Sequence, residues 1–316
     1  MLRYKGFSLI KPNETQSEKI SQIIDNFNGS IFHEVELNKI VQYNFNSDLF
    51  FLVDNPENIK CLAPVHISKN KLGLKRYLLS PMGDIPYAGF VGELRIDVKQ
   101  LKVGLLESIK YTGFPYIQDT IHDDIVSEFG ETNMVDLSLE EDEIFNSVIH
   151  SKRRNMIRKA SKVGITIKTY FSQDGLKEFW PILEGLHKKL GYTSLTFDYY
   201  NKLFQNYVEK KQAFVSIAFK DNTPISGILV LGNKNYMHYY KGASLFGIKN
   251  EGHGELLQWE AIKTCISLGV KYYDLCNLDK EKLPAIYRFK TGISQNIIKY
   301  RKHTLNNLGY KILNKI

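Results

Sequence analysis

The chain of 316 residues is longer than a typical single domain, which predicts about two domains, each able to bury its own core. Hydrophobic residues make up 43% and charged residues 24%; this composition excludes a disordered or fibrous protein and indicates a packed enzyme or binding protein. The formal net charge of +8 and the pI near 9.1 favour partners that carry phosphate, although a basic surface also serves solubility.

Cysteine usage and hydropathy indicate a cellular compartment. The three cysteines Cys61, Cys265 and Cys276 lie far apart, in no metal-ligand or CxxC spacing. We therefore expect no disulfide framework, no metal site and a reducing environment. The first residues contain no apolar core of signal-peptide length, and no run of about 18 apolar residues occurs. The sequence predicts a cytoplasmic protein without a transmembrane segment.

The first half of the chain is predicted to contain strands, a loop and a helix. Three β-type runs come first, and the first two are separated by a turn-rich stretch that predicts a hairpin: residues 47–54, 58–68 and 74–81. Residues 82–92 are dense in Gly and Pro and predict a loop. Asp97 is placed as the N-cap of a helix predicted over 97–111, whose apolar positions include Ile109. A further strand is predicted at 114–119.

A composition change near residue 137 predicts a boundary between a lobe of residues 1–137 and a lobe of residues 138–316. Ser138 is predicted to cap a helix with an acidic first turn and basic later turns, ended by Gly164. Pro181 should kink or restart one of the helices that follow. The remaining elements are predicted in this order: strand 165–171, helices 175–191 and 196–210, strands 212–220, 224–233 and 235–244, helix 254–269, and strands 270–277 and 295–302.

This order of elements is the order of the GNAT acyltransferase fold, and the first half shows a poorer version of it. The stretches "RRNMIRKASKVGITI", "HYYKGAS", "LLQWEAIKTCISLGVKYYDL" and "FKTG" come in the order and approximate spacing of FemAB-like proteins. The chain thus resembles the tandem-GNAT transferases that add amino acids to peptidoglycan precursors, and a related branch labelled BioF2-like. The resemblance implies an α/β (α+β) fold with two GNAT-like lobes, each a mixed, mostly antiparallel sheet flanked by helices.

Acyl transfer to an amine needs a group that stabilises the tetrahedral oxyanion. The resemblance places an aromatic residue and a lysine at the reaction centre, and the matching residues are Phe289 and Lys290. Lys290 would stabilise the oxyanion, and Phe289 would pack against the donor or hold the lysine; otherwise Phe289 is core and Lys290 solvated. Strand alternation puts Tyr239 and Tyr240 on opposite faces, so that one can be core while the other reaches the cleft. The resemblance favours Tyr239 as hydrogen-bond donor or proton relay; the alternative is a buried structural tyrosine.

Two segments are candidates for binding phosphate. Lys249, Gly252 and Gly254 imitate the GNAT pyrophosphate loop before a helix, which would suit coenzyme A. Arg154 and Arg158 share a helix face and could hold a diphosphate of the acceptor or of a nucleic acid, unless the charges form a solvated face.

Asp274 and Cys276 lie on one face of the strand predicted at 270–277. Asp274 could orient the acceptor amine or cap the following loop, and Cys276 is not expected to be a nucleophile. Apolar residues at helical spacing among lysines over 305–316 predict docking on the body of the protein or weak contact with a membrane surface.

The sequence therefore predicts a transferase that moves an acyl or aminoacyl group onto an amine of a cell-envelope precursor, such as a muropeptide or a nucleotide- or lipid-linked amino sugar. Direct attack would need neither a metal nor a permanent cofactor. The donor would be an aminoacyl-tRNA, which fits the basic charge, or an acyl-coenzyme A. The latter fits the pyrophosphate-like loop and the missing coiled-coil arm of the peptidoglycan enzymes. The alternative is a non-catalytic binding protein on a tandem GNAT scaffold.

Overall fold

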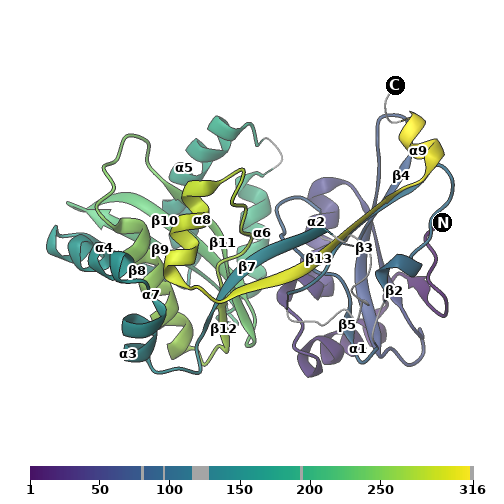
Figure 1. Cartoon of the computed structure of the whole chain (residues 1–316), viewed down its shortest axis with the longest axis horizontal. Coiled ribbons are helices and arrows are strands. Elements are labelled where there is room, and N and C mark those ends of the chain that lie inside the picture. The colour runs from purple at the N-terminus through teal and green to yellow at the C-terminus, as the bar shows by residue number, and fades with distance from the viewer. Residues whose placement is uncertain (80–81, 95–96, 116–127, 193–194, 314–316) are drawn as a thin grey trace. The chain divides into compact units, whose positions relative to one another are not determined.

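The computed structural model describes the chain except for residues 80–81, 95–96, 116–127, 193–194 and 314–316. The chain divides into two compact units (Figure 1). Unit 1 contains Met1–Glu131 and Ile298–Ile316, and unit 2 contains Thr132–Ile297. Each unit has a mixed, mostly antiparallel sheet flanked by helices, which is the predicted fold class.

The end of the chain belongs to unit 1, whereas the sequence analysis assigned residues 138–316 to the second lobe. Strand β13 (Ile297–Asn306) pairs antiparallel with β6 (Ser108–Thr112), and these backbone hydrogen bonds bring the last residues back to the first unit. Residue 137, the predicted boundary, lies just after β7 (Glu128–Asp136), and the units divide within that strand.

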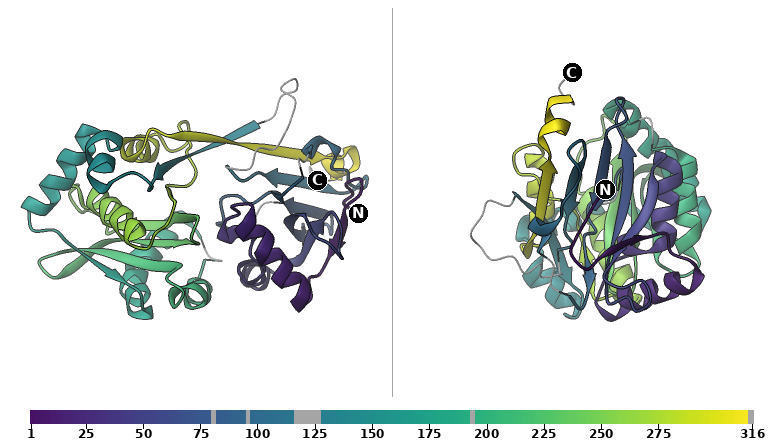
Figure 2. Two further views of the ribbon diagram at one scale, coloured as in Figure 1. Left: turned by 90° about the horizontal axis from the view of Figure 1, so that it is seen from below. Right: turned by 90° about the vertical axis from the view of Figure 1, so that its right-hand side faces the viewer.

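Unit 1 is a sheet with helices on one face. Besides β6, β13 and the start of β7, it contains β1 (Ser8–Ile10), α1 (Glu14–Asn26), α2 (Val35–Phe45), β2 (Asp48–Val53), β3 (Cys61–Lys69), β4 (Lys75–Leu79), β5 (Val91–Gly92) and α9 (Leu308–Leu313). The strand order is β1-β2-β3-β4-β6-β13, with β5 beside β3. The predicted hairpin is β2 and β3, and β4 adds the third strand. Figure 2 shows α1 and α2 in purple against this sheet.

The helix predicted over 97–111 is wrong. Asp97 does act as an N-cap, and its side chain accepts a hydrogen bond from Lys99 N, but it starts only a 3-10 turn at Val98–Gln100. Ile109 lies instead in β6, which pairs with β4 on one side and β13 on the other. Pairing with two neighbouring strands overrides the helical spacing of the apolar residues. The strand predicted at 114–119 lies mostly outside the described residues.

Unit 2 contains the predicted succession of elements. These are α3 (Glu141–Glu143), α4 (Ser151–Lys162), β8 (Thr166–Tyr170), α5 (Gln173–Leu190), α6 (Phe197–Val208), β9 (Ala213–Lys220), β10 (Thr223–Gly232), β11 (Tyr236–Ser244), α7 (His253–Ser267), β12 (Tyr272–Asp274) and α8 (Pro284–Ile293). The strand order is β7-β12-β11-β10-β9-β8, in which β11 and β12 are parallel. Helices α5 and α6 contact one face of the sheet, and α7, with α4 beside it, contacts the other.

Two predictions about the helices of unit 2 need correction. The segment after Ser138 is not one helix: α3 continues as a π-helical turn at Ile144–Val148, the chain becomes extended at Ile149, and α4 begins after His150. The Ser138 hydroxyl donates to Asp136 instead of capping a helix. Gly164 does follow the end of α4 with a positive φ, as predicted. Helix α5 runs through Pro181 without interruption.

Candidate active site

Lys290 is a buried cation on α8. Its side chain is 8% exposed, and Nζ donates to the carbonyl oxygens of Cys276 at 2.6 Å and Asn277 at 3.1 Å. Both Cys276 and Asn277 have positive φ, a conformation that costs free energy in residues other than glycine. The ammonium group therefore stabilises the turn after β12, and burial lowers the Lys290 pKa. Lys290 is not the solvated lysine of the alternative interpretation.

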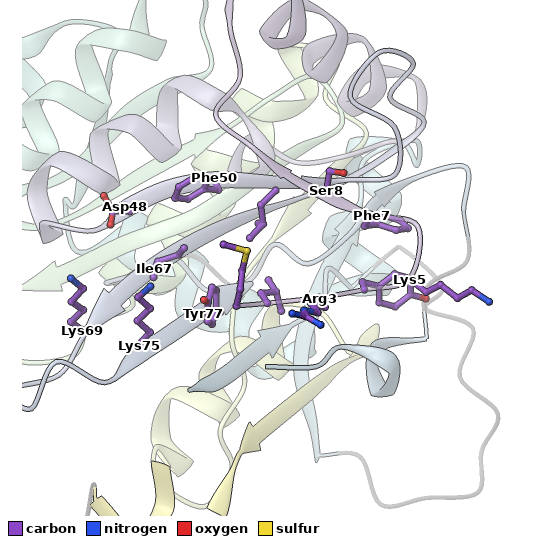
Figure 3. A pocket seen from close by; sticks show the side chains of 14 residues that line it. Arg3, Lys5, Phe7, Ser8, Asp48, Phe50, Ile67, Lys69, Lys75 and Tyr77 are labelled. Atoms are coloured by element: carbon purple, nitrogen blue, oxygen red, sulfur yellow. The ribbon is translucent and has the colours of Figure 1, made fainter. Parts of the chain in front are cut away.

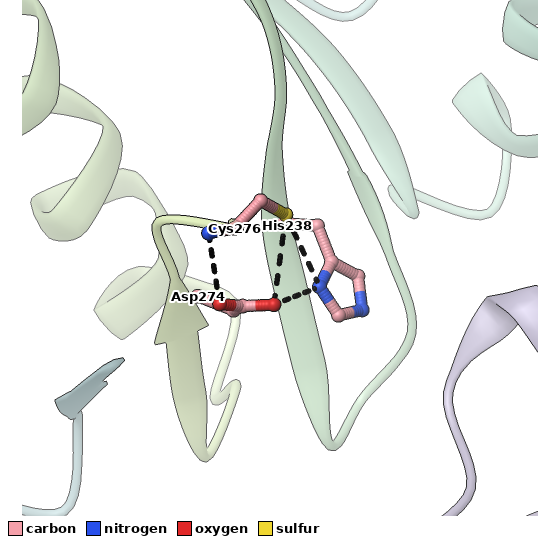
Figure 4. Close-up of side chains that lie close together, drawn as sticks. All are labelled: His238, Asp274 and Cys276. Atoms are coloured by element: carbon pink, nitrogen blue, oxygen red, sulfur yellow. Dashed lines mark hydrogen bonds and ion pairs between the residues drawn. The ribbon is translucent and has the colours of Figure 1, made fainter. Parts of the chain in front are cut away.

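A group of buried polar side chains lies beside this turn (Figure 4). Asp274 accepts hydrogen bonds from the Thr132 hydroxyl at 2.6 Å and from Cys276 N at 2.9 Å, and its Oδ2 lies 2.7 Å from Nδ1 of His238. Burial raises the Asp274 pKa to about 7, although the nearby Lys290 charge acts in the opposite direction. A carboxyl group that titrates near neutrality is typical of functional sites.

His238, Asp274 and Cys276 could together serve as metal ligands. Nδ1 of His238, a carboxylate oxygen of Asp274 and Sγ of Cys276 lie within 4.8 Å of one another, and this donor set suits Zn²⁺. In the structure these atoms contact each other directly, and burial raises the Cys276 pKa well above its ordinary value. Sequence spacing gave no sign of this group, because His238 comes from β11 and Cys276 from the turn after β12.

Tyr239 and Tyr240 contact opposite sides of the sheet, as strand alternation predicted. The Tyr239 ring lies 5.6 Å from Nζ of Lys290, whereas the Tyr240 hydroxyl lies 3.2 Å from that of Tyr199 on α6. The register between β10 and β11 shifts by one residue at a β-bulge, from Val230 opposite Tyr239 to Leu229 opposite Lys241, so that Tyr239 and Gly242 share one face. A Cβ on Gly242 would lie 2.0 Å from the Tyr239 hydroxyl, so a larger residue there would displace the Tyr239 side chain.

A cavity of about 280 Å³ brings several predicted site residues together. It is lined by Tyr239 from β11, Gly254 and Gln258 from α7, and Phe289 from α8, together with small residues of β10 and β11. Phe289 therefore faces a cavity and not only the core. The cavity opens next to the first turn of α7, where a helix N-terminus attracts anions.

The predicted pyrophosphate loop leads into α7. Gly252 is its N-cap with φ of 93°, and a Cβ there would lie 2.1 Å from the Met156 carbonyl oxygen, so close packing of α4 explains this glycine. Lys249 is exposed, and no side chain in the described part of the chain caps the first backbone N–H groups of α7. His253 is 8% exposed, and its Nδ1 has no hydrogen-bond partner among the described residues.

The predicted pair of arginines on α4 makes other contacts. Arg154 donates to the backbone oxygens of Asn146 and Ile149, at the break before α4, and Arg158 lies over the ring of Phe145 at 5.2 Å. Binding of a diphosphate by Arg154 and Arg158 stays a prediction.

Arg153, which the sequence analysis did not single out, lies at the site. Its guanidinium forms a 2.7 Å ion pair with Glu255 in the first turn of α7, donates to the Arg288 carbonyl and lies 5.5 Å from the Phe289 ring centre. Glu255 is 2% exposed, so this is a buried ion pair that joins α4, α7 and α8. The sequence signal was present, because Arg153 opens the stretch "RRNMIRKASKVGITI".

Comparisons with known proteins identify the fold that carries this site. Residues 150–291 match the family model described as "Acetyltransferase (GNAT) domain". No curated protein sequence matches. Among solved structures, FemX is 12% identical, covers 98% of this chain and 99% of its own, and has a TM-score of 0.65. L-PGS from Bacillus licheniformis is 13% identical, with 98% and 96% covered and a TM-score of 0.53. A tandem GNAT protein from the clavulanic acid biosynthesis pathway is 9% identical, with 95% and 98% covered and a TM-score of 0.53.

The chain therefore has the tandem GNAT acyltransferase fold, as the FemAB-like resemblance predicted. The matched domain, residues 150–291, contains Lys290, Tyr239, Asp274 and the start of α7. No helix among the described residues is both long and apolar enough to cross a membrane.

Proposed function

We propose that unit 2 is an N-acyltransferase that moves an acyl group from an activated donor to an amine. The observation that carries this proposal is the buried Lys290 ammonium, 5.6 Å from the ring of Tyr239, which itself lines the cavity before α7. In the reaction the amine nitrogen attacks the carbonyl carbon, a tetrahedral oxyanion forms, and the thiolate or the tRNA hydroxyl leaves. The attacking nitrogen loses one proton, which ends on the leaving group or in solvent.

Lys290 is the residue that would stabilise the oxyanion. Two of its three N–H donors hold the carbonyls of Cys276 and Asn277, which fixes the direction of the third. A donor that is already fixed in place needs no reorganisation when charge develops, and removing one such donor typically lowers kcat by about 10²- to 10³-fold. Tyr239, whose pKa burial raises to about 12, would remain a neutral hydrogen-bond donor throughout the neutral pH range.

Asp274 has a positioning role in this proposal. Its carboxylate contacts Thr132, His238 and the backbone of Cys276, and so it holds the turn whose carbonyls bind Lys290. The orientation of the acceptor amine by Asp274 stays a prediction, as does the binding of substrate by Tyr240 and by Arg154 and Arg158.

Acyl-coenzyme A is the donor that the start of α7 favours. The backbone N–H groups of its first turn can donate to phosphate, with the exposed Lys249 nearby in sequence. The acidic neighbours do not oppose this, because Glu255 pairs with Arg153 and Glu251 with Lys220. Aminoacyl-tRNA is the second candidate, supported by the net charge of +8 and by the resemblance to FemAB-like proteins.

The acceptor we propose is an amine of a cell-envelope precursor. FemX and a protein described as a putative lysylphosphatidylglycerol synthetase, of which a C-terminal domain has a TM-score of 0.56, share the fold and support an envelope-linked substrate. A nucleotide- or lipid-linked precursor would also complement the basic charge of the chain.

The test is label transfer by the purified protein. Radiolabelled acetyl-coenzyme A, longer acyl-coenzyme A esters and charged tRNA are each incubated with muropeptides, nucleotide-linked amino sugars and aminoacylated lipid precursors, and labelled products are separated by chromatography. The proposal expects a stable amide product with at least one donor. Tight binding of a nucleotide-linked precursor without transfer from any donor would favour the non-catalytic alternative.

A further inference from the structure

A second cavity, of about 720 Å³, lies in unit 1, and none of its lining residues belongs to the candidate active site of unit 2 (Figure 3). It is lined by the N-terminal segment, residues 1–9, and by one face of β2, β3 and β4. Its volume is in the range of cavities that bind small molecules.

The sheet face under the segment is divided into an apolar row and a polar row. Strand alternation places Phe50 of β2, Ile67 of β3 and Tyr77 of β4 on the same face, and all three line the cavity. Phe50 and Ile67 pack against the hydrophobic core cluster to which Tyr77, Leu2 and Leu52 belong. The cavity therefore lies at the edge of that core.

The polar row lies at one end of the cavity. Lys69 and Lys75 are direct partners in the register of β3 and β4, and like charges in directly opposed positions destabilise a sheet. Neither lysine forms an ion pair with any described residue, and both are exposed. Asp48 also lies on this face, at the start of β2. A bound anion would relieve the repulsion between the two ammonium groups.

The cover of the cavity is held in place. Arg3 exchanges two backbone hydrogen bonds with Lys102, and Glu107 accepts hydrogen bonds from the Tyr77 hydroxyl and from the amino group of Met1. Arg3 and Lys5 of this segment add two cations to the cavity wall, so that four cations and one carboxylate line it. The segment is thus a fixed wall of the cavity, and its charges favour an anion.

We propose that this cavity binds a single-chain anionic amphiphile, with its phosphate or carboxylate between Lys69 and Lys75 and its hydrocarbon chain along Phe50, Ile67 and Tyr77. Both anions share the chemistry that two ammonium groups recognise, and the apolar row supplies the affinity for the chain. The inference does not depend on acyl transfer by unit 2.

The experiment is calorimetric titration of the full chain with dodecyl phosphate, dodecanoate, dodecylphosphocholine and inorganic phosphate, each below its micelle concentration. We expect the two anionic amphiphiles to bind with one molecule per chain, and the zwitterion and inorganic phosphate to bind far more weakly. The double variant Lys69→Ala/Lys75→Ala should weaken dodecyl phosphate binding at least about tenfold. Ile67→Ala should also weaken it while leaving the charges unchanged.

Arg76→Ala is the matched control, because Arg76 is an exposed cation of β4 on the opposite face. It should change the affinity less than about twofold. The proposal would be overturned if the double variant bound dodecyl phosphate with wild-type affinity. It would also be overturned if the wild-type protein bound dodecylphosphocholine as tightly as dodecyl phosphate. Binding to anionic phospholipid vesicles without binding of monomeric dodecyl phosphate would overturn it as well, because it would indicate contact with a bilayer.

Discussion

The two units use buried ionisable groups in opposite ways. Unit 1 buries His33 and His66 separately, and burial lowers the pKa of each to about 4, so that both are neutral near pH 7. His33 contacts Ser30 and Ala88, and His66 contacts Ser47 and Asn38. Both imidazoles therefore act as neutral hydrogen-bonding groups in the interior of unit 1.

Unit 2 instead gathers four of its buried ionisable groups in one place. Asp274, His238 and Cys276 contact each other, and Lys290 binds the carbonyl of Cys276. Charges held together in a buried site cost free energy, because they are desolvated, and a fold tolerates that cost mainly where function needs it. This contrast favours unit 2 as the place of the proposed chemistry.

The largest effect is expected when the buried cation of unit 2 is removed. Lys290→Met should lower the rate of label transfer by about 10²- to 10³-fold, because the oxyanion loses its charged donor. It should also lower stability, since the Cys276 and Asn277 carbonyls lose their partner. Arg288→Ala, an exposed position on the same helix, is the control and should stay within a few-fold of wild type. Equal rates for the two variants would remove Lys290 from the mechanism.

Breaking the buried ion pair of unit 2 should be the next largest effect. Arg153→Met leaves the Glu255 carboxylate buried without its partner, and such a change costs about 3 to 5 kcal/mol of stability. Lys152→Met, at an exposed neighbouring position, should cost less than about 0.5 kcal/mol. Denaturant unfolding followed by tryptophan fluorescence reports on unit 2, because Trp180 and Trp259 both lie in it. Similar midpoints for the two variants would show that the pair does not hold α4 and α7.

The Asp274 carboxyl of unit 2 and the buried histidines of unit 1 should contribute to the pH dependence of stability with opposite signs. The Asp274 pKa rises from 3.8 to about 7 on folding, so folded unit 2 binds more protons between these values and becomes less stable as pH rises through this range. The pKa values of His33 and His66 fall from 6.5 to about 4 on folding. These two groups therefore make unit 1 more stable as pH rises between these values. Each contribution has a slope of at most about 1.4 kcal/mol per pH unit.

Asp274→Asn isolates the contribution of unit 2. The difference in unfolding free energy between wild type and Asp274→Asn, followed by tryptophan fluorescence, should change steadily from pH 4 to pH 7 and level off above it. A difference that is constant over this range would mean that Asp274 is ionised throughout, with a pKa near its ordinary value.

The smallest effect is expected at Tyr239. Tyr239→Phe removes a hydroxyl but keeps the ring near Lys290, and we expect about a tenfold lower kcat with little change in stability. Tyr199→Phe is a matched control, because its hydroxyl lies on the other side of the sheet, beside that of Tyr240. If both variants retain wild-type rates, the Tyr239 hydroxyl takes no part in proton transfer.

Much of unit 2 could be predicted from its sequence, because its strands and helices are long and strongly patterned. Helix α7 and the hairpins of β9, β10 and β11 follow the predicted order. Unit 1 was predicted less well: α1 was not assigned, although Asn13 and Gln16 form a capping box at its start, and residues 97–111 were assigned to the wrong element. There, pairing between distant strands decides the structure, and local spacing does not reveal it.

The candidate site was predictable only in part. Lys290, Phe289 and Tyr239 came from the family resemblance, and the structure brings Lys290 and Phe289 each close to Tyr239. The contacts of Asp274 with His238 and Thr132 join residues of three strands, and no sequence spacing encodes them. Burial, which shifts the pKa values of Asp274 and Lys290, is likewise a property of the folded chain.

The most direct test is a crystal structure of the protein with a nonhydrolysable analogue of the donor that supports transfer. The account predicts that the analogue's carbonyl oxygen lies within hydrogen-bond distance, about 3 Å, of Nζ of Lys290. Its phosphate groups, if the donor is a coenzyme A ester, should meet the first turn of α7. A donor carbonyl bound elsewhere, with Lys290 still holding the Cys276 and Asn277 carbonyls and touching no ligand, would contradict it.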